Sequence, residues 1–181
     1  MKALVYSLLL FTLLSSSNCK KSSATEDQLP PETTTGAMTF GCKVDGKVFV
    51  PKDGNGKPGL YVQYVYLGNG VDEGWHLNIP AFDYNDNPNK GVSILTDSLF
   101  LEEGTSYFFN NSTGNPQAFY RESGSNGVAV FPKLDSDSGM LNITKHDKIN
   151  HILSGNFFFT GTNTSTNQKV SITDGRFDIK Y

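Results

Sequence analysis

Apolar and polar side chains alternate with a period of two through much of the chain after Thr39. The alternation runs over residues 75–79, 141–144, 155–160, 170–173 and 176–181. A strand with one buried face has this period, because successive side chains point to opposite faces. Asp45-Gly46 is a strong signal for a two-residue hairpin turn, and clusters of Gly, Asn and Pro separate the other segments. Short strands with such turns predict an all-β fold, an antiparallel β-sandwich, with a β-barrel as the alternative.

The first 18 residues have the pattern of an export signal. Lys2 precedes an apolar run from Ala3 to Leu14, which is shorter than the roughly 20 apolar residues that span a bilayer. Cys19 follows, and a cysteine at this place looks like the lipidated residue of a bacterial lipoprotein. We predict that residues 1–18 are removed and that lipid on Cys19 holds the protein to the outer membrane, on the periplasmic face or at the cell surface. Ordinary secretion, with a cut among residues 15–17, is the alternative.

Residues 19–38 are rich in Ser, Thr, Pro and charge and have no apolar periodicity. Such a segment does not bury a core, so we predict a disordered tether that ends where the domain, residues 39–181, begins. If extended, the tether would reach about 60 Å from the membrane.

Both ends of the domain carry distinct motifs. Thr39–Val50 reads TFGCKVDGKVFV, and residues 152–160 and 170–181 read ILSGNFFFT and VSITDGRFDIKY. Together these segments resemble a domain-of-unknown-function family of small envelope lipoproteins from Bacteroidota. The resemblance implies a lipid-anchored, all-β domain, and it implies no activity.

The closing motif also has a structural interpretation. The phenylalanines that lie on the apolar face of its strands are expected in the core, and its glycines suit bulges or close approaches between strands. These residues are Phe157, Phe159, Phe177, Gly155 and Gly175. Arg176 and Asp178 have the opposite phase, and we expect them on the solvent side of the last strand, where charges discourage edge-to-edge pairing.

An oxygen-rich run offers a weak calcium candidate at Asp83, Asn85 and Asn87. The full calcium-loop signature requires Gly at its sixth position and Glu at its twelfth, where this chain has Pro88 and Ile94. Turns are also commonly built from Asx residues, so we predict no metal site, and this loop is the best of the weak calcium candidates.

No catalytic motif predicts an enzyme. The chain has no Gly-x-Ser-x-Gly elbow, phosphate loop or HExxH. Cys42 has an apolar phase and is expected to be a small buried side chain rather than a nucleophile. The histidines are expected at the surface; they are His76, His146 and His151. We predict a non-enzymatic protein without a cofactor, and a hydrolase is the alternative.

Aromatic residues give the best hint of a ligand. On the strand predicted near residues 60–66, Tyr61 has one phase, and Tyr64 and Tyr66 have the other. Tyr61, Trp75 and Tyr84 are the candidate residues for stacking against a sugar, although tyrosine also suits sheet surfaces without a ligand.

The charge balance limits the partners. With 15 basic and 18 acidic side chains, the chain lacks the basic excess on which nucleic-acid binding relies. The sequence predicts a binding or interaction module for a glycan or an envelope protein, and a carbohydrate-binding module is the more specific alternative. Asp97-Ser98-Leu99 also matches a short pattern found at O-glycosylated sites in Bacteroidota, and an ordinary turn is the other interpretation.

Overall fold

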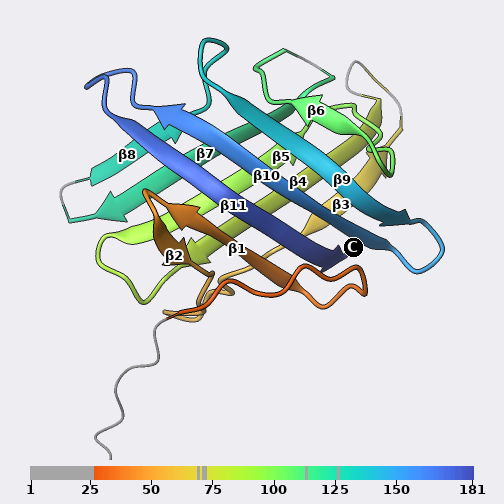
Figure 1. The fold of residues 1–181 in the computed structure, drawn as a ribbon, viewed down its shortest axis with the longest axis horizontal. Coiled ribbons are helices and arrows are strands. Elements are labelled where there is room, and N and C mark those ends of the chain that lie inside the picture. Colours follow the sequence, from red (N-terminus) through yellow and green to blue (C-terminus); the bar gives the residue numbers. More distant parts are fainter. Residues whose placement is uncertain (1–26, 69, 71–72, 113, 126) are drawn as a thin grey trace, which may run out of the picture.

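A computed structural model of the chain describes residues 27–68, 70, 73–112, 114–125 and 127–181 (Figure 1). The predicted signal and the predicted lipidation site, Cys19, lie outside the described residues. The described residues form eleven strands and no helix, so no helix among them is long and apolar enough to cross a membrane.

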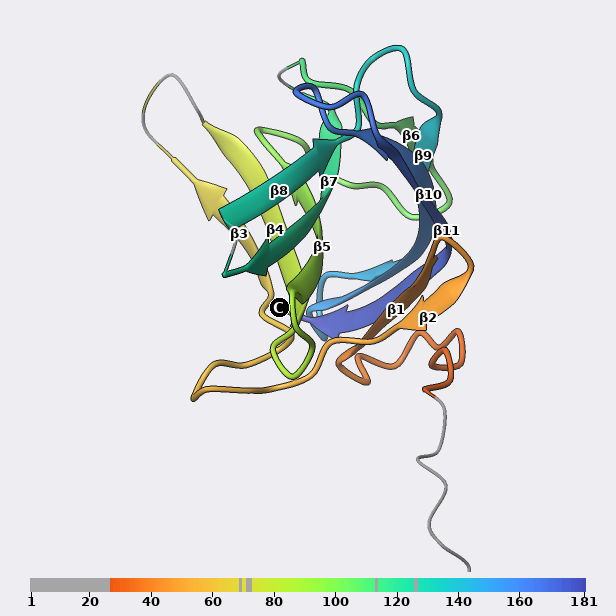
Figure 2. The same cartoon turned by 90° about the vertical axis from the view of Figure 1, so that its left-hand side faces the viewer.

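The strands form two antiparallel sheets that lie as two layers (Figure 2). The six-stranded sheet contains, in spatial order, β2 (Lys47–Phe49), β1 (Thr39–Val44), β11 (Lys169–Lys180), β10 (Ile152–Thr162), β9 (Gly139–Asp147) and β6 (Ser106–Phe108). The five-stranded sheet contains β3 (Gln63–Leu67), β4 (Gly74–Asp83), β5 (Asn89–Thr96), β7 (Pro116–Gly124) and β8 (Gly127–Pro132). The sheets do not close into a barrel, and the predicted β-sandwich is confirmed.

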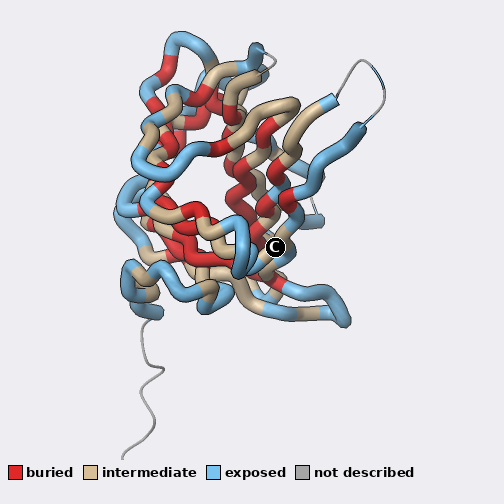
Figure 3. The backbone as a smooth tube through the Cα atoms, turned by 90° about the vertical axis from the view of Figure 1, so that its right-hand side faces the viewer, coloured by how far each residue is buried: buried red, intermediate tan, exposed pale blue. Residues whose placement is uncertain are grey.

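The core lies between the layers, where the inward faces of both sheets are buried (Figure 3). Leu77 and Ile79 of β4 and Leu141 and Ile143 of β9 belong to this core, and all four side chains are almost fully buried. Cys42 is also fully buried, and its burial raises the pKa of its thiol, as expected for a structural rather than a reactive cysteine.

The closing motif forms two crossed pairs between β10 and β11. Gly155 lies opposite Phe177, and Phe157 lies opposite Gly175. A Cβ atom on Gly155 would lie 2.8 Å from the Phe177 ring, and one on Gly175 would lie 2.5 Å from the Phe157 ring. Each ring therefore fills the space that the glycine of the opposite strand leaves. The predicted core position of both phenylalanines and the predicted close approach of both glycines are confirmed.

The predicted disordered tether is wrong for residues 27–38, which we call the strap. The strap runs along the outer face of the six-stranded sheet, where Pro30 lies so close to Gly41 that a Cβ atom there would be 2.6 Å from the proline Cδ. The strap buries no apolar core of its own, as its polar composition predicted. Polar contacts with the sheet hold it in place.

The carboxylate of Asp178 binds the strap to the sheet through several hydrogen bonds. Its side chain is on the outer face of β11, but only 1% of the residue is exposed. Its carboxylate accepts hydrogen bonds from the Thr33 hydroxyl (2.6 Å), from the amides of Thr35 (2.9 Å), Gly36 (2.8 Å) and Ala37 (3.1 Å), and from the Ser154 hydroxyl (2.7 Å). Burial alone would raise the pKa of Asp178, but these bonds outweigh it and hold the pKa far below its usual range.

The predicted solvent exposure of Asp178 is therefore wrong, although its predicted face is correct. The strap covers this part of the outer face, and Arg176 is also half-buried, with its guanidinium 3.8 Å from Glu32 of the strap. Moreover, β11 lies between β1 and β10, so its charges do not protect a sheet edge.

Candidate functional site

A cleft of about 740 Å³ lies between the two sheets at one end of the sandwich. One wall comes from β2, from the β1–β2 turn and from the start of β11. The other wall comes from the end of β4, the β4–β5 turn, and the inward side chains of β5, β7 and β8. Apolar side chains at its base continue into the core; they are Phe49, Tyr120, Phe131 and Val170.

Charged side chains occupy inward positions on three adjacent strands of the cleft. Asp83 of β4 lies opposite Lys90 of β5, and Lys90 lies opposite Glu122 of β7. Direct partners in antiparallel strands point to the same face, so the three side chains form one row of alternating charge. The middle of this face is apolar, with Ile79 and Ile94 forming one of its buried pairs.

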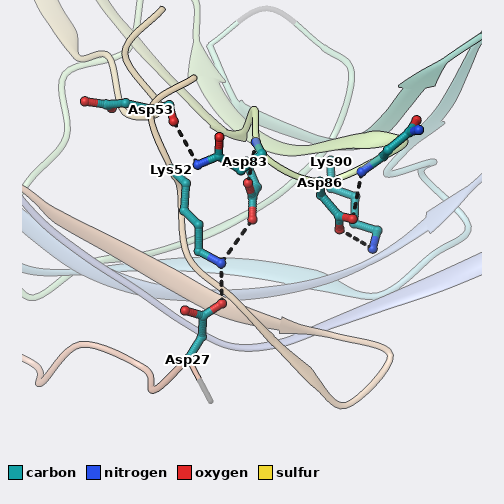
Figure 4. A network of polar contacts seen from close by, with 8 residues as sticks. Asp27, Lys52, Asp53, Asp83, Asp86 and Lys90 are labelled. Atoms are coloured by element: carbon teal, nitrogen blue, oxygen red, sulfur yellow. Dashed lines mark hydrogen bonds and ion pairs between the residues drawn. The ribbon is translucent and has the colours of Figure 1, made fainter. Parts of the chain in front are cut away.

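Lys52 joins this row from the segment after β2, which runs alongside the end of β4 (Figure 4). Its backbone is fixed beside β4, because its amide donates to the Phe82 carbonyl and its carbonyl accepts from the Tyr84 amide. The Lys52 ammonium then lies 2.5 Å from the Asp27 carboxylate and 3.3 Å from that of Asp83. The bond to Asp27 is the main cause that raises the pKa of Lys52. The start of the strap is thus tied to the rim of the cleft.

Two further pairs complete the polar lining. The Lys90 ammonium donates to Asp86 at 2.6 Å, and this bond lowers the pKa of the Asp86 carboxyl. The Tyr120 hydroxyl donates to Glu122 at 2.7 Å, and the pKa of Tyr120 is raised by its burial and then by this bond.

The three pKa shifts bear on the protonation states of Lys52, Tyr120 and Asp86. Lys52 and Tyr120 are shifted upward and Asp86 downward, so each holds its ordinary protonation state more firmly at neutral pH. A general acid or base works best with a pKa near neutrality. These three side chains are suited to donating and accepting hydrogen bonds with a ligand.

The calcium candidates lie at the cleft but are engaged by protein groups. Asp83 accepts a bond from the Asn85 amide (2.8 Å) through one oxygen and faces Lys52 through the other. The Asn85 side chain donates to the Asp53 carbonyl, and the Asn87 amide donates to Asp86. In the part of the chain that the structure describes, no three His, Cys, Asp or Glu residues are arranged to hold a metal ion.

The three aromatic candidates do not come together. Trp75 lies on the inner face near the start of β4 and packs against Tyr64, with ring centroids 4.9 Å apart. Tyr84 follows the other end of β4, about 30 Å away along an extended strand, and stacks on Phe82 at 5.5 Å. Tyr61 is 47% exposed on the outer face. These residues do not form one stacking surface.

The structure also places a predicted surface histidine, His146, and the proposed glycosylation site, Ser98. The expected surface position is wrong for His146, which is 8% exposed and lies with its ring nitrogens 2.5 Å from the Leu101 carbonyl and 2.8 Å from the Tyr181 hydroxyl. Ser98, the possible glycosylation site, is half-buried with a φ of 51°, and a Cβ atom on Gly74 would lie 2.7 Å from its Cα.

Our interpretation of the sequence missed Lys52, Lys90 and Glu122. A usable signal was present, because Asp83, Lys90 and Glu122 each continue the inward phase of a strand that is otherwise apolar, as Ile79 and Ile94 illustrate.

Comparisons with protein-family models, with curated proteins and with solved structures found no match to this chain.

Proposed function

We propose that this protein is a non-enzymatic, lipid-anchored binding protein of the outer membrane that takes up a small polar ligand in the cleft between its sheets. The row formed by Asp83, Lys90 and Glu122 carries the proposal. Each of the three is paired, with Lys52, Asp86 and Tyr120, and buried ion pairs add little to stability, so a paired row at the mouth of a cleft favours a role in binding.

The charges of the cleft indicate the chemistry of the ligand. Four lysines and five carboxylates line it, with both signs interspersed, so it favours neither a polyanion nor a polycation. The paired side chains offer donors and acceptors above an apolar base. A small uncharged or zwitterionic molecule with both donors and acceptors fits this lining.

With lipid on Cys19, the contacts of the strap would keep the cleft close to the membrane. The eight peptide units from Cys19 to Asp27 reach at most about 29 Å. Asp27 is bonded to Lys52 at the rim, so lipid on Cys19 would keep the mouth of the cleft within about that distance of the membrane. This is about half the reach expected from a tether that is free up to residue 38.

A ligand screen with matched variants tests the cleft. The full chain in detergent is melted with amino acids, neutral mono- and disaccharides, and phosphocholine. A ligand at 100 times its Kd adds about 2.7 kcal/mol, a shift of roughly 5 °C or more for a domain of this size. Glu122→Gln should weaken binding at least about tenfold, because a hydrogen bond to a charged group contributes about 1.5–3 kcal/mol.

Glu73→Gln is the matched control, because Glu73 also accepts a bond from a tyrosine hydroxyl, that of Tyr66 at 2.6 Å, but lies outside the cleft. This variant should bind like the wild type. A screen without any shift, or equal binding by Glu122→Gln and wild type, would refute the cleft as the ligand site.

The anchor has its own test. Cys19→Ser removes the thiol that would carry lipid, and the protein should then leave the membrane fraction and lose the acyl mass in intact-mass spectrometry. Cys42→Ser is the control, because Cys42 is buried in the domain and should leave the acyl mass unchanged. A membrane fraction that retains Cys19→Ser, or a wild-type mass without acyl chains, would contradict lipid anchoring.

A further inference from the structure

An exposed apolar row crosses the outer face of the six-stranded sheet, which lies in front in Figure 1. Phe108 of β6 lies directly opposite Met140 of β9, and Met140 lies directly opposite Phe158 of β10. Phe108 is 74% exposed and Phe158 is 41% exposed. Partners in antiparallel strands point to the same face, and two strand spacings place the phenylalanines about 10 Å apart.

The surroundings of this row are polar but uncharged. Ser106, Asn142 and Asn156 form the adjacent row across the same three strands, and the Ser106 hydroxyl donates to the Asn142 side chain at 3.1 Å. On the other side, Thr160 and Ser138 lie with their hydroxyl oxygens 3.5 Å apart. The nearest charged pairs lie beyond these rows: Lys145, further along β9, lies 3.4 Å from Glu103, and Asp174 of β11 is paired with Lys43 at 3.1 Å.

From this arrangement we infer that the outer face of β6, β9 and β10 is a platform for a neutral, extended oligosaccharide. The negative face of an aromatic ring attracts the C–H groups on the face of a sugar ring. Phe108 and Phe158 would hold the first and third sugars of a trisaccharide unit, with the middle sugar over Met140. The amides and hydroxyls beside the row can bond the sugar hydroxyls without a charged partner.

Other occupants fit this face less well. A stable protein interface uses roughly 20–30 residues on each side, whereas the apolar row has three. Anionic lipid is attracted by Lys and Arg, and the two rows contain neither. The platform lies on the outer face of one sheet, and the cleft lies between the sheets, so this inference does not depend on the proposed ligand of the cleft.

Calorimetric titration of the full chain in detergent with neutral hexasaccharides tests the platform. The probes are the hexamers of β-linked glucose, xylose, mannose and N-acetylglucosamine. At least one should bind, and Phe108→Ala and Phe158→Ala should each weaken it about tenfold. Val128→Ala is the control and should bind normally, because Val128 is 60% exposed but lies on β8 of the other sheet. The matching disaccharide, which reaches one ring only, should bind at least about tenfold more weakly.

Three results would overturn the inference. The first is that none of the hexasaccharides binds. The second is that binding is equal in Phe108→Ala, Phe158→Ala and the wild type. The third is that either substitution dissociates a dimer of the full chain in sedimentation experiments, which would make the row a contact between copies.

Discussion

Replacing Asp178 with alanine should lower the free energy of unfolding by about 3 kcal/mol, because a hydrogen bond to a buried charged group contributes about 1.5–3 kcal/mol. Asp178 accepts such bonds from Ser154 and from four residues of the strap. The loss is smaller than the sum over these bonds, since the strap can leave the sheet and its donors can bond to water. For a domain of this size, the melting temperature should fall by roughly 6–12 °C.

Limited proteolysis should show where the change occurs. In Asp178→Ala, residues 27–38 should become accessible to protease while the two sheets stay protected. Asp174→Asn is the matched control on the same strand, because Asp174 pairs with Lys43 at the exposed surface, such a pair adds little to stability, and asparagine tolerates the positive φ of 52° at this position. Equal melting temperatures of Asp178→Ala and Asp174→Asn would show that Asp178 does not fasten the strap.

The same carboxylate predicts an acid dependence of stability. Its pKa in the folded protein is held far below its usual value, whereas in the unfolded chain it returns to about 3.9. This group therefore adds its full contribution to the free energy of unfolding above about pH 5. The contribution is lost progressively as the pH falls below about 4. The difference in unfolding free energy between wild type and Asp178→Ala should shrink over that window. A constant difference from pH 7 to pH 3 would contradict the assigned hydrogen bonds.

Gly175→Val should also destabilise the protein, by about 3 kcal/mol, which is the upper range for forcing extra atoms into a packed core. Valine suits strands, so the loss would come from overlap with the Phe157 ring, 2.5 Å from the new Cβ atom. In a Phe157→Leu background the overlap is reduced, and Gly175→Val should lower the unfolding free energy by at least about 1 kcal/mol less than in the wild type.

Gly68→Val is the control for this double-mutant cycle. A Cβ atom on Gly68 would meet only the edge of the Tyr66 ring, at 3.4 Å, so the substitution should change the melting temperature little. Additive effects of Gly175→Val and Phe157→Leu would mean that the ring and the glycine are not coupled across β10 and β11.

The strands were predictable because their signal is local. Alternation of apolar residues located the strands of the core, and Asp45-Gly46 forms the expected hairpin turn, with positive φ at both residues (47° and 81°). The strap was not predictable in the same way. Its composition indicates disorder, and the residue that accepts its hydrogen bonds, Asp178, is more than 140 positions further along the chain.

The functional surfaces were harder to predict because they depend on which strands are neighbours. Trp75 and Tyr84 are close in sequence, yet the length of β4 separates them. Asp83, Lys90 and Glu122 meet only through the pairing of β4, β5 and β7, and Phe108 meets Phe158 only through β9. Periodicity gives the face of each side chain, but it does not give the register or the order of the strands.

The most direct test of the cleft is a map of amide chemical-shift changes on adding the compound that produces the largest thermal shift. Binding in the cleft predicts changes at residues 45–52, 83–90 and 120–122, which come from both sheets and line it. Changes confined to other regions, such as the exposed end of the β3–β4 hairpin around Tyr66 and Leu67, would contradict the proposed function.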